Sequence, residues 1–107
     1  MIQVTYHRQY NRVTVEGHAG SGPEGHDLVC AAVSALALTL AGNVSHMEAQ
    51  GAVYSVTINL KDGNAEIQCT PYRRYKDSVA QFYRAVCVGF ELLATKYPEN
   101  IFYEVRG

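Results

Sequence analysis

Residues 17–34 decide the fold, and they read Gly17-His18-Ala19-Gly20-Ser21-Gly22-Pro23-Glu24-Gly25-His26-Asp27-Leu28-Val29-Cys30-Ala31-Ala32-Val33-Ser34. Before this stretch, apolar residues alternate with polar ones, which is typical of a half-buried strand. After it, apolar residues recur every three to four positions, which is typical of a helix. We therefore expect His18 at the end of a strand and Cys30 near the start of a helix, with a glycine-rich loop between them.

Other strands and helices are predicted on both sides of this stretch. Alternating residues over 2–7 and 12–17 predict two strands joined by a turn at 9–11. Asp27 is expected to cap the first helix, which we expect to fade between Gly42 and His46. Its predicted core face is made by Val29, Val33, Leu36, Leu40, Val44 and Met47.

The second half of the chain repeats this pattern. Tyr54, Val56, Ile58 and Leu60 alternate with polar residues, and the turn Lys61-Asp62-Gly63-Asn64 predicts a hairpin whose return strand carries the core residues Ala65, Ile67 and Cys69. An apolar stripe between a possible cap at Asp77 and Pro98 predicts the second helix, and residues 101–105 predict a last strand. The order ββαββαβ predicts an α+β, two-layer domain over residues 1–107, in which both helices pack on one face of a mixed β-sheet.

Composition excludes several classes of function. The net charge is −1 without a basic block, so no nucleic-acid partner is expected. The apolar run from Leu28 to Gly42 is shorter than a membrane span, so no membrane partner is expected. The three cysteines form no disulfide framework, which favours a reduced, cytoplasmic setting.

Cys30 and His18 form the candidate catalytic pair. With Asp27 as the cap, Cys30 would be the third residue of the helix, where free N–H groups favour a thiolate and stabilise an oxyanion. Gly17 permits backbone angles that re-aim the next side chain, so His18 is expected within hydrogen-bond reach of the thiol. Ser34 lies one turn after Cys30 and either donates a hydrogen bond near the sulfur or simply packs.

Three other interpretations of these residues remain open. Cys30 on an apolar helix is also consistent with a buried, inert side chain. The loop matches the dinucleotide pattern G-x-G-x-x-G, although Glu24 would repel a pyrophosphate and a hairpin follows the helix. A metal site made by His18, His26 and Cys30 would have only three ligands, so no metal and no organic cofactor is expected.

The sequence resembles the ribosomal-processing cysteine protease family called Prp over essentially its whole length. The resemblance is carried by Gly-His-Ala at 17–19, by Gly-His-Asp-Leu-Val-Cys-Ala at 25–31, by the twelve-residue step between His18 and Cys30, and by Ser34. The match is weakest in the loop, at Ser21 and Pro23.

This resemblance implies a function and a set of roles. Prp-like enzymes remove an N-terminal extension, apolar and containing phenylalanine, from large-subunit ribosomal protein twenty-seven. It implies a Cys–His dyad of Cys30 and His18, with Gly17, Asp27 and Ser34 as supporting residues, and it implies a homodimer. It further implies a loop that moves as substrate enters, made by Gly20, Ser21, Gly22, Pro23, Glu24, Gly25 and His26. The alternative is a non-catalytic ribosome-associated or peptide-binding domain of the same fold.

Overall fold

The structure is a computed structural model that describes the backbone of residues 1–17 and 25–107 and the side chains of residues 1–17 and 28–107. Within these ranges the chain forms seven main elements in the order ββαββαβ, as the sequence predicted. These are β1 (Ile2–His7), β2 (Arg12–Gly17), α1 (Gly25–Ala49), β3 (Val53–Lys61), β4 (Asn64–Pro71), α2 (Lys76–Lys96) and β5 (Ile101–Arg106).

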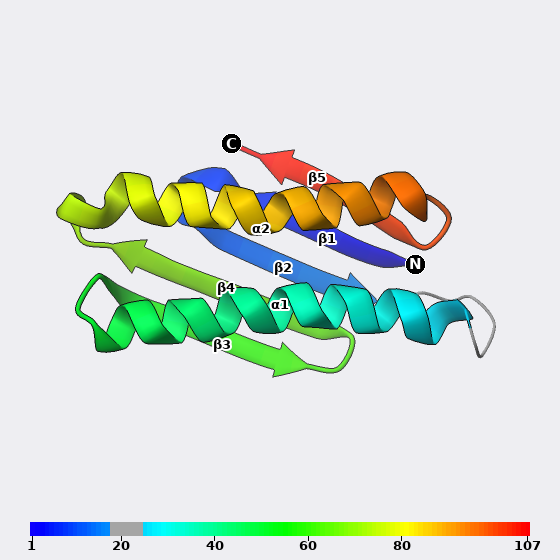
Figure 1. The fold of residues 1–107 in the computed structure, drawn as a ribbon, viewed down its shortest axis with the longest axis horizontal. Coiled ribbons are helices and arrows are strands. Elements are labelled where there is room, and N and C mark those ends of the chain that lie inside the picture. The colour runs from blue at the N-terminus through cyan, green and yellow to red at the C-terminus, as the bar shows by residue number, and fades with distance from the viewer. Residues whose placement is uncertain (18–24) are drawn as a thin grey trace.

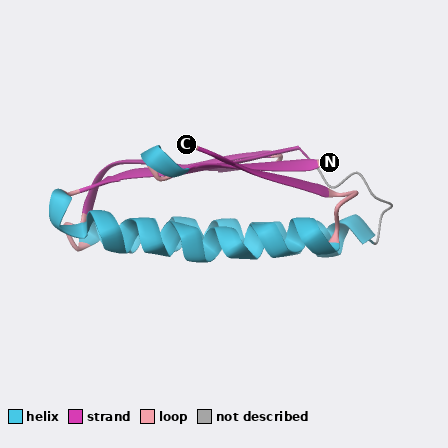
Figure 2. Ribbon diagram, turned by 90° about the horizontal axis from the view of Figure 1, so that it is seen from above, coloured by secondary structure: helices cyan, strands magenta, loops and turns pink. Residues whose placement is uncertain are grey.

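The strands form one sheet in the order β3-β4-β2-β1-β5 (Figure 1). Neighbouring strands are antiparallel except β1 and β5, which are parallel, so the sheet is mixed. Seen along the sheet, both helices lie on the same side of it (Figure 2). The α+β fold with two helices on one face is thereby confirmed.

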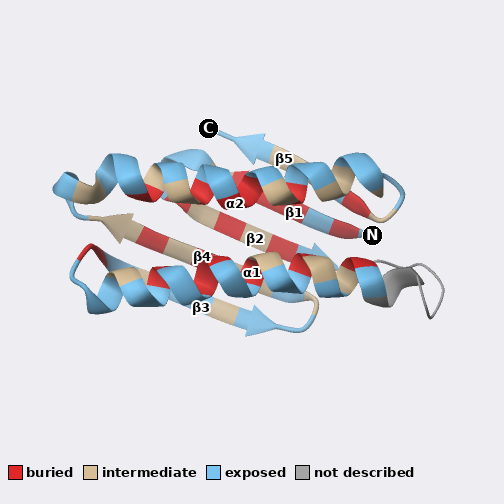
Figure 3. Cartoon of the chain, in the orientation of Figure 1, coloured by how far each residue is buried: buried red, intermediate tan, exposed pale blue. Residues whose placement is uncertain are grey.

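The core lies between this sheet face and the two helices (Figure 3). Alternate strand residues point toward the helices because side chains in a strand alternate between faces. The residues that this interface buries completely or nearly so include Val4, Val13, Ile67, Leu40, Val44, Tyr83 and Phe90. Their burial supplies the main driving force for folding.

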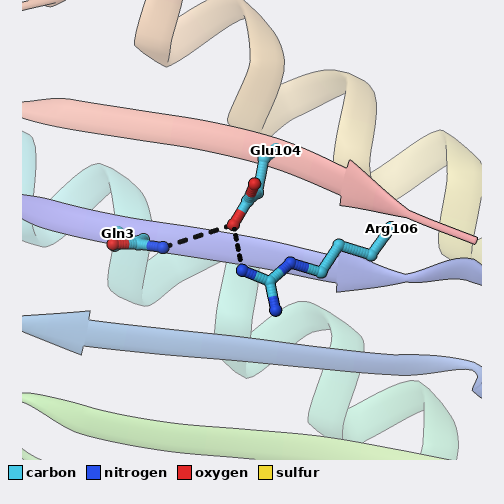
Figure 4. A network of polar contacts seen from close by, with 3 residues as sticks. All are labelled: Gln3, Glu104 and Arg106. Carbon is cyan, nitrogen blue, oxygen red and sulfur yellow. Dashed lines mark hydrogen bonds and ion pairs between the residues drawn. The ribbon is translucent and has the colours of Figure 1, made fainter.

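The opposite sheet face carries polar groups and is covered by no described element. Arg106 forms an ion pair of 3.0 Å with Glu104, which also accepts a hydrogen bond from Gln3 on the neighbouring strand (Figure 4). Arg12 and Glu66 form a second ion pair of 2.6 Å across β2 and β4. The side chains of both pairs are partly exposed to water, and pairs of this kind contribute little to stability.

The two helices begin earlier than predicted. Helix α1 starts at Gly25, so Asp27 is its third residue and not the cap, and Gly25 and His26 belong to the helix and not to the loop. Similarly, α2 starts at Lys76, one residue before Asp77. The predicted caps were wrong because an acidic residue inside the first turn also suits the positive end of a helix, and sequence alone does not separate the two positions.

Helix α1 is also longer than predicted at its other end. It runs through Gly42 to Ala49, where the Gly51 N–H bonds to the Glu48 carbonyl and closes the turn. From Leu28 onward the helix is long and apolar enough to span a membrane by length and composition, so the estimate that the run is too short was wrong. A core helix meets the same test, and here Val33, Leu40 and Val44 are buried against the sheet.

Strand β3 departs from the predicted core face. A bulge between Tyr54 and Thr57, with Ser55 at φ 50°, turns Tyr54 to the outer face, where its ring packs 4.7 Å from the ring of Tyr72. Ile58 and Leu60 do face the helices, but they stay 38% and 44% exposed because β3 is an edge strand.

A buried cluster of thiols and phenols lies under α2. The Tyr83 hydroxyl contacts the Cys69 sulfur at 3.6 Å, and the Tyr83 ring stacks on that of Tyr6. Burial raises the pKa of Cys69, of Tyr83 and of Tyr6, and it raises the pKa of Cys87 to about 12. All four groups therefore stay neutral in the folded protein at physiological pH.

Gly17 ends β2 in a conformation that only glycine adopts easily, with φ +91°. Its N–H donates to the Gly63 carbonyl at 2.9 Å, which ties the end of β2 to the β3–β4 turn. A Cβ at this position would clash with the backbone carbonyl oxygen of Met1. Gly51 also has a positive φ, +78°, but a Cβ there would meet nothing within 4 Å.

We expect Gly17→Ala to destabilise the protein by roughly 2–5 kcal/mol, because it combines backbone strain with a clash against another segment. The matched variant Gly51→Ala carries the strain alone and should cost about 1–2 kcal/mol. Urea unfolding of both variants measures the difference. Equal losses would show that the Met1 contact does not constrain residue 17.

We also expect stability to fall as the pH rises above about 9. The folded cluster keeps its protons there while the unfolded thiols lose theirs, so the unfolded state is favoured increasingly up to about pH 12, where the folded Cys87 thiol also titrates. The free energy of unfolding measured between pH 7 and 11 should decline, and Cys87→Ala should flatten the decline. An unchanged slope in that variant would contradict the role of this thiol.

Candidate active site

The end of β2, the start of α1 and the β3–β4 turn lie at the same end of the molecule (Figure 1). Residues from these segments line a cavity of about 310 Å³. Its lining residues come from three places in the sequence, namely the start of α1, the core face of the sheet and the hairpin. They are Ile2, Val15, Gly17, Cys30, Val33, Ser34, Ala37, Leu38, Leu60, Lys61, Asp62, Gly63, Asn64 and Ala65.

Cys30 is partly buried and lines this cavity from α1. It is the sixth residue of the helix and not the third, since the helix begins at Gly25. The free amides of a helix belong to its first four residues, so the Cys30 amide lies within the helical hydrogen-bond ladder. The expected position of Cys30 as the third residue of the helix was therefore wrong, and the free N–H groups of the helix end lie about one turn before it.

The other two cysteines are core residues, as the sequence predicted. Cys69 on β4 and Cys87 on α2 are 1% and 2% exposed. Burial raises the pKa of both thiols, which disfavours the reactive thiolate. Cys30 is thus the one cysteine of the three that an external molecule reaches through a cavity.

Gly17 lines the same cavity as Cys30. His18 itself lies outside the described residues, as do Gly20, Ser21, Gly22, Pro23 and Glu24 of the predicted mobile loop. Gly17, the residue before His18, is described, and the hydrogen bond from its N–H to the Gly63 carbonyl holds it in place. The structure therefore brings the strand end that carries the histidine and the helix that carries the cysteine to one cavity.

The remaining predicted site residues differ in their positions. Ser34 is exposed and lines the cavity one turn after Cys30, so these two residues open on the same cavity. Asp27 lies in the first turn of α1, and its side chain is outside the described part.

Sequence reasoning missed the β3–β4 hairpin as part of the site. Lys61, Asp62 and Asn64 form one wall of the cavity, although they lie far from Cys30 in the sequence. The turn itself was predicted from Asp-Gly. Its location next to the site follows from the antiparallel pairing of β2 with β4, in which Glu16 lies opposite Asn64, and that pairing leaves no local signal in the sequence.

The two cofactor interpretations can be compared with the fold. A dinucleotide site of the G-x-G-x-x-G type needs a helix that leads into a parallel strand, whereas α1 leads into β3, which pairs antiparallel with β4. Among the described side chains no group of three His, Cys, Asp or Glu residues could hold a metal ion. His18 and the side chain of His26, two of the three proposed ligands, lie outside that search.

Comparisons with known proteins identify the family. The family model described as "Cysteine protease Prp" matches residues 1–102. No curated protein matches the sequence closely enough to count as a relative.

Solved structures show the same fold. The crystal structure of SMU.848 from Streptococcus mutans is 30% identical, with a TM-score of 0.71 over 99% of this chain and 94% of that one. Two structures of an essential ribosomal processing protease Prp from S. aureus are 23% and 22% identical, with TM-scores of 0.70 and 0.69 over 98% of this chain and 97% of each of those. One holds a covalently linked product peptide and the other a substrate peptide.

The matched residues include the strand end at Gly17 and the helix carrying Cys30, whose side chain opens on the cavity. This chain belongs to the cysteine protease Prp family.

Proposed function

We propose that this cysteine protease removes the N-terminal extension of large-subunit ribosomal protein twenty-seven, with Cys30 as the nucleophile and His18 as the base. The observation that carries the proposal is that Cys30 opens onto a cavity that also reaches Gly17, the residue before His18. Acyl transfer by a thiol requires a base within hydrogen-bond reach of the nucleophile, and His18 directly follows Gly17 in the sequence.

The proposed reaction is acyl transfer through a thioester on Cys30, followed by hydrolysis. His18 takes the proton of the Cys30 thiol, and the sulfur attacks the carbonyl carbon of the scissile bond. The C–N bond then breaks, the histidine returns its proton to the leaving amine, and a thioester remains on Cys30. Water, deprotonated by the same histidine, hydrolyses the thioester and regenerates the thiol. These steps consume one water and need no oxidant, metal or organic cofactor.

Two other residues have supporting roles in this proposal. Ser34 lies on the cavity wall one turn beyond Cys30. In this proposal its hydroxyl donates a hydrogen bond to a substrate carbonyl near the sulfur. Asp27 lies in the first turn of α1, where a carboxylate suits the positive helix end.

The family and its solved members support the choice of substrate. The S. aureus protein of the same fold is described as a ribosomal processing protease and binds a substrate peptide. A ribosomal protein substrate also implies action in the cytoplasm, and we propose the homodimer that the family resemblance implies.

The first test is selective labelling of the thiols. We expect an electrophilic thiol reagent at neutral pH to modify Cys30 alone in the folded protein, because Cys69 and Cys87 are buried. All three cysteines should react in denaturant. Mass spectrometry counts the labels, and rapid native labelling of Cys69 or Cys87 would contradict the assignment. If Cys30 reacts no faster than free cysteine, the protein is better described as a non-catalytic peptide-binding domain.

The second test removes each member of the dyad. Cys30→Ala and His18→Ala should each lower the rate of processing of the extended ribosomal protein by at least about a thousandfold, as losses of nucleophile or base do. His46→Ala is the matched control, because this exposed histidine lies near the far end of α1. It should process at the normal rate. A His18→Ala variant that keeps normal turnover removes His18 from the mechanism, while circular dichroism separates lost chemistry from lost folding.

A further inference from the structure

The wall of the cavity is predominantly apolar, although its rim is polar. Ile2, Val15 and Val33 are buried residues of the core that also line the cavity. The charged residues Lys61 and Asp62 come from the hairpin turn at one side. At about 310 Å³ the cavity is at the lower limit of ligand pockets, which suits a single large side chain.

Two alanines with small side chains line this cavity and contribute to its free volume. Ala37 lies on α1, where it is 6% exposed. Ala65 begins the core face of β4, opposite Val15 on one neighbouring strand and Leu60 on the other. Residues directly opposite in a sheet point to the same face, so the short side chain of Ala65 lies between two larger apolar ones.

The rest of β4 shows what a larger residue at position 65 would do. The next core-facing residue, Ile67, has a larger side chain and is fully buried. Ala65 is one of the residues that line the open space of the cavity, whereas Ile67 is not among them. A branched or longer side chain at position 65 would project into that space, and it would suit a strand as well as alanine does.

We propose that Ala65 is a specificity-determining residue: its small side chain leaves room for a large apolar side chain of the substrate beside Cys30. This inference rests on the proposed function, since it assumes that Cys30 is the nucleophile. It assigns the selection of substrate side chains to the second residue pair of the β3–β4 hairpin, Leu60 and Ala65, which contributes no group to the proposed chemistry. Residue 65 thus acts on binding and not on the reacting atoms.

The test measures alkylation of Cys30 by three reagents. Iodoacetamide has no side chain and reports on the thiol alone. Acetyl-glycyl-phenylalanyl chloromethyl ketone and its alanyl counterpart differ only in the side chain next to the reactive carbon. We expect the wild-type protein to react faster with the phenylalanyl reagent, by about tenfold or more, as a fitting apolar pocket discriminates.

The variant Ala65→Leu should remove this preference, measured as the ratio of the phenylalanyl rate to the alanyl rate, with the iodoacetamide rate of each variant as its reference. Ala94→Leu is the matched control, because Ala94 is a partly buried alanine on α2 that lines a second cavity sharing no residue with the first. It should keep the wild-type preference. Thermal unfolding checks that both variants fold, and Ala65→Val replaces Ala65→Leu if the latter does not.

Each outcome has one meaning. A phenylalanyl preference that survives in Ala65→Leu, or is absent in the wild type while Cys30 still reacts rapidly, overturns the role of Ala65 and leaves the proposed function intact. Slow reaction of Cys30 with all three reagents overturns the proposed function itself. Loss of the preference in Ala65→Leu but not in Ala94→Leu supports the inference.

Discussion

The pairing of β2 with β4 is the contact on which the rest of the structure depends. It joins the first hairpin to the second and places β2 in the middle of the sheet. Because the pairing is antiparallel, the end of β2 meets the start of β4, and the Gly17 N–H reaches the Gly63 carbonyl. The cavity lies at this junction, where residues of α1, the end of β2 and the β3–β4 hairpin line it.

The fold could be predicted from the sequence because its signals are periodic and local. The stripe that includes Val79, Tyr83 and Phe90 on α2 is buried as its spacing indicated, and the Asp-Gly turn joins two strands. The prediction of buried residues was wrong in β3, where tertiary structure decides which side chains are buried. The edge position of β3 and its bulge at Ser55 leave apolar residues exposed that alternation alone would place in the core.

The candidate site could be predicted only in part. The order of Gly17, Cys30 and Ser34 along the sequence, with helical spacing between the last two, indicated that they share one region, and all three line the cavity. The hairpin wall and Ala65 could not be predicted, because they join the site through strand register and not through sequence neighbourhood. The sequence pattern of a strand does not indicate whether an alanine in it leaves free volume beside a functional site.

The bulge in β3 has a consequence for how the protein avoids aggregation. An edge strand exposes unpaired amides and carbonyls that invite further strands, and Ile58 and Leu60 make this edge apolar as well. The left-handed backbone at Ser55 breaks the extended conformation near the start of the strand. An incoming strand would lose its register at that point, so the regular part of the open edge is confined to the segment after Tyr54. The bulge at Ser55, which made the prediction of the β3 core face wrong, thus also limits the pairing of β3 with a strand of another molecule.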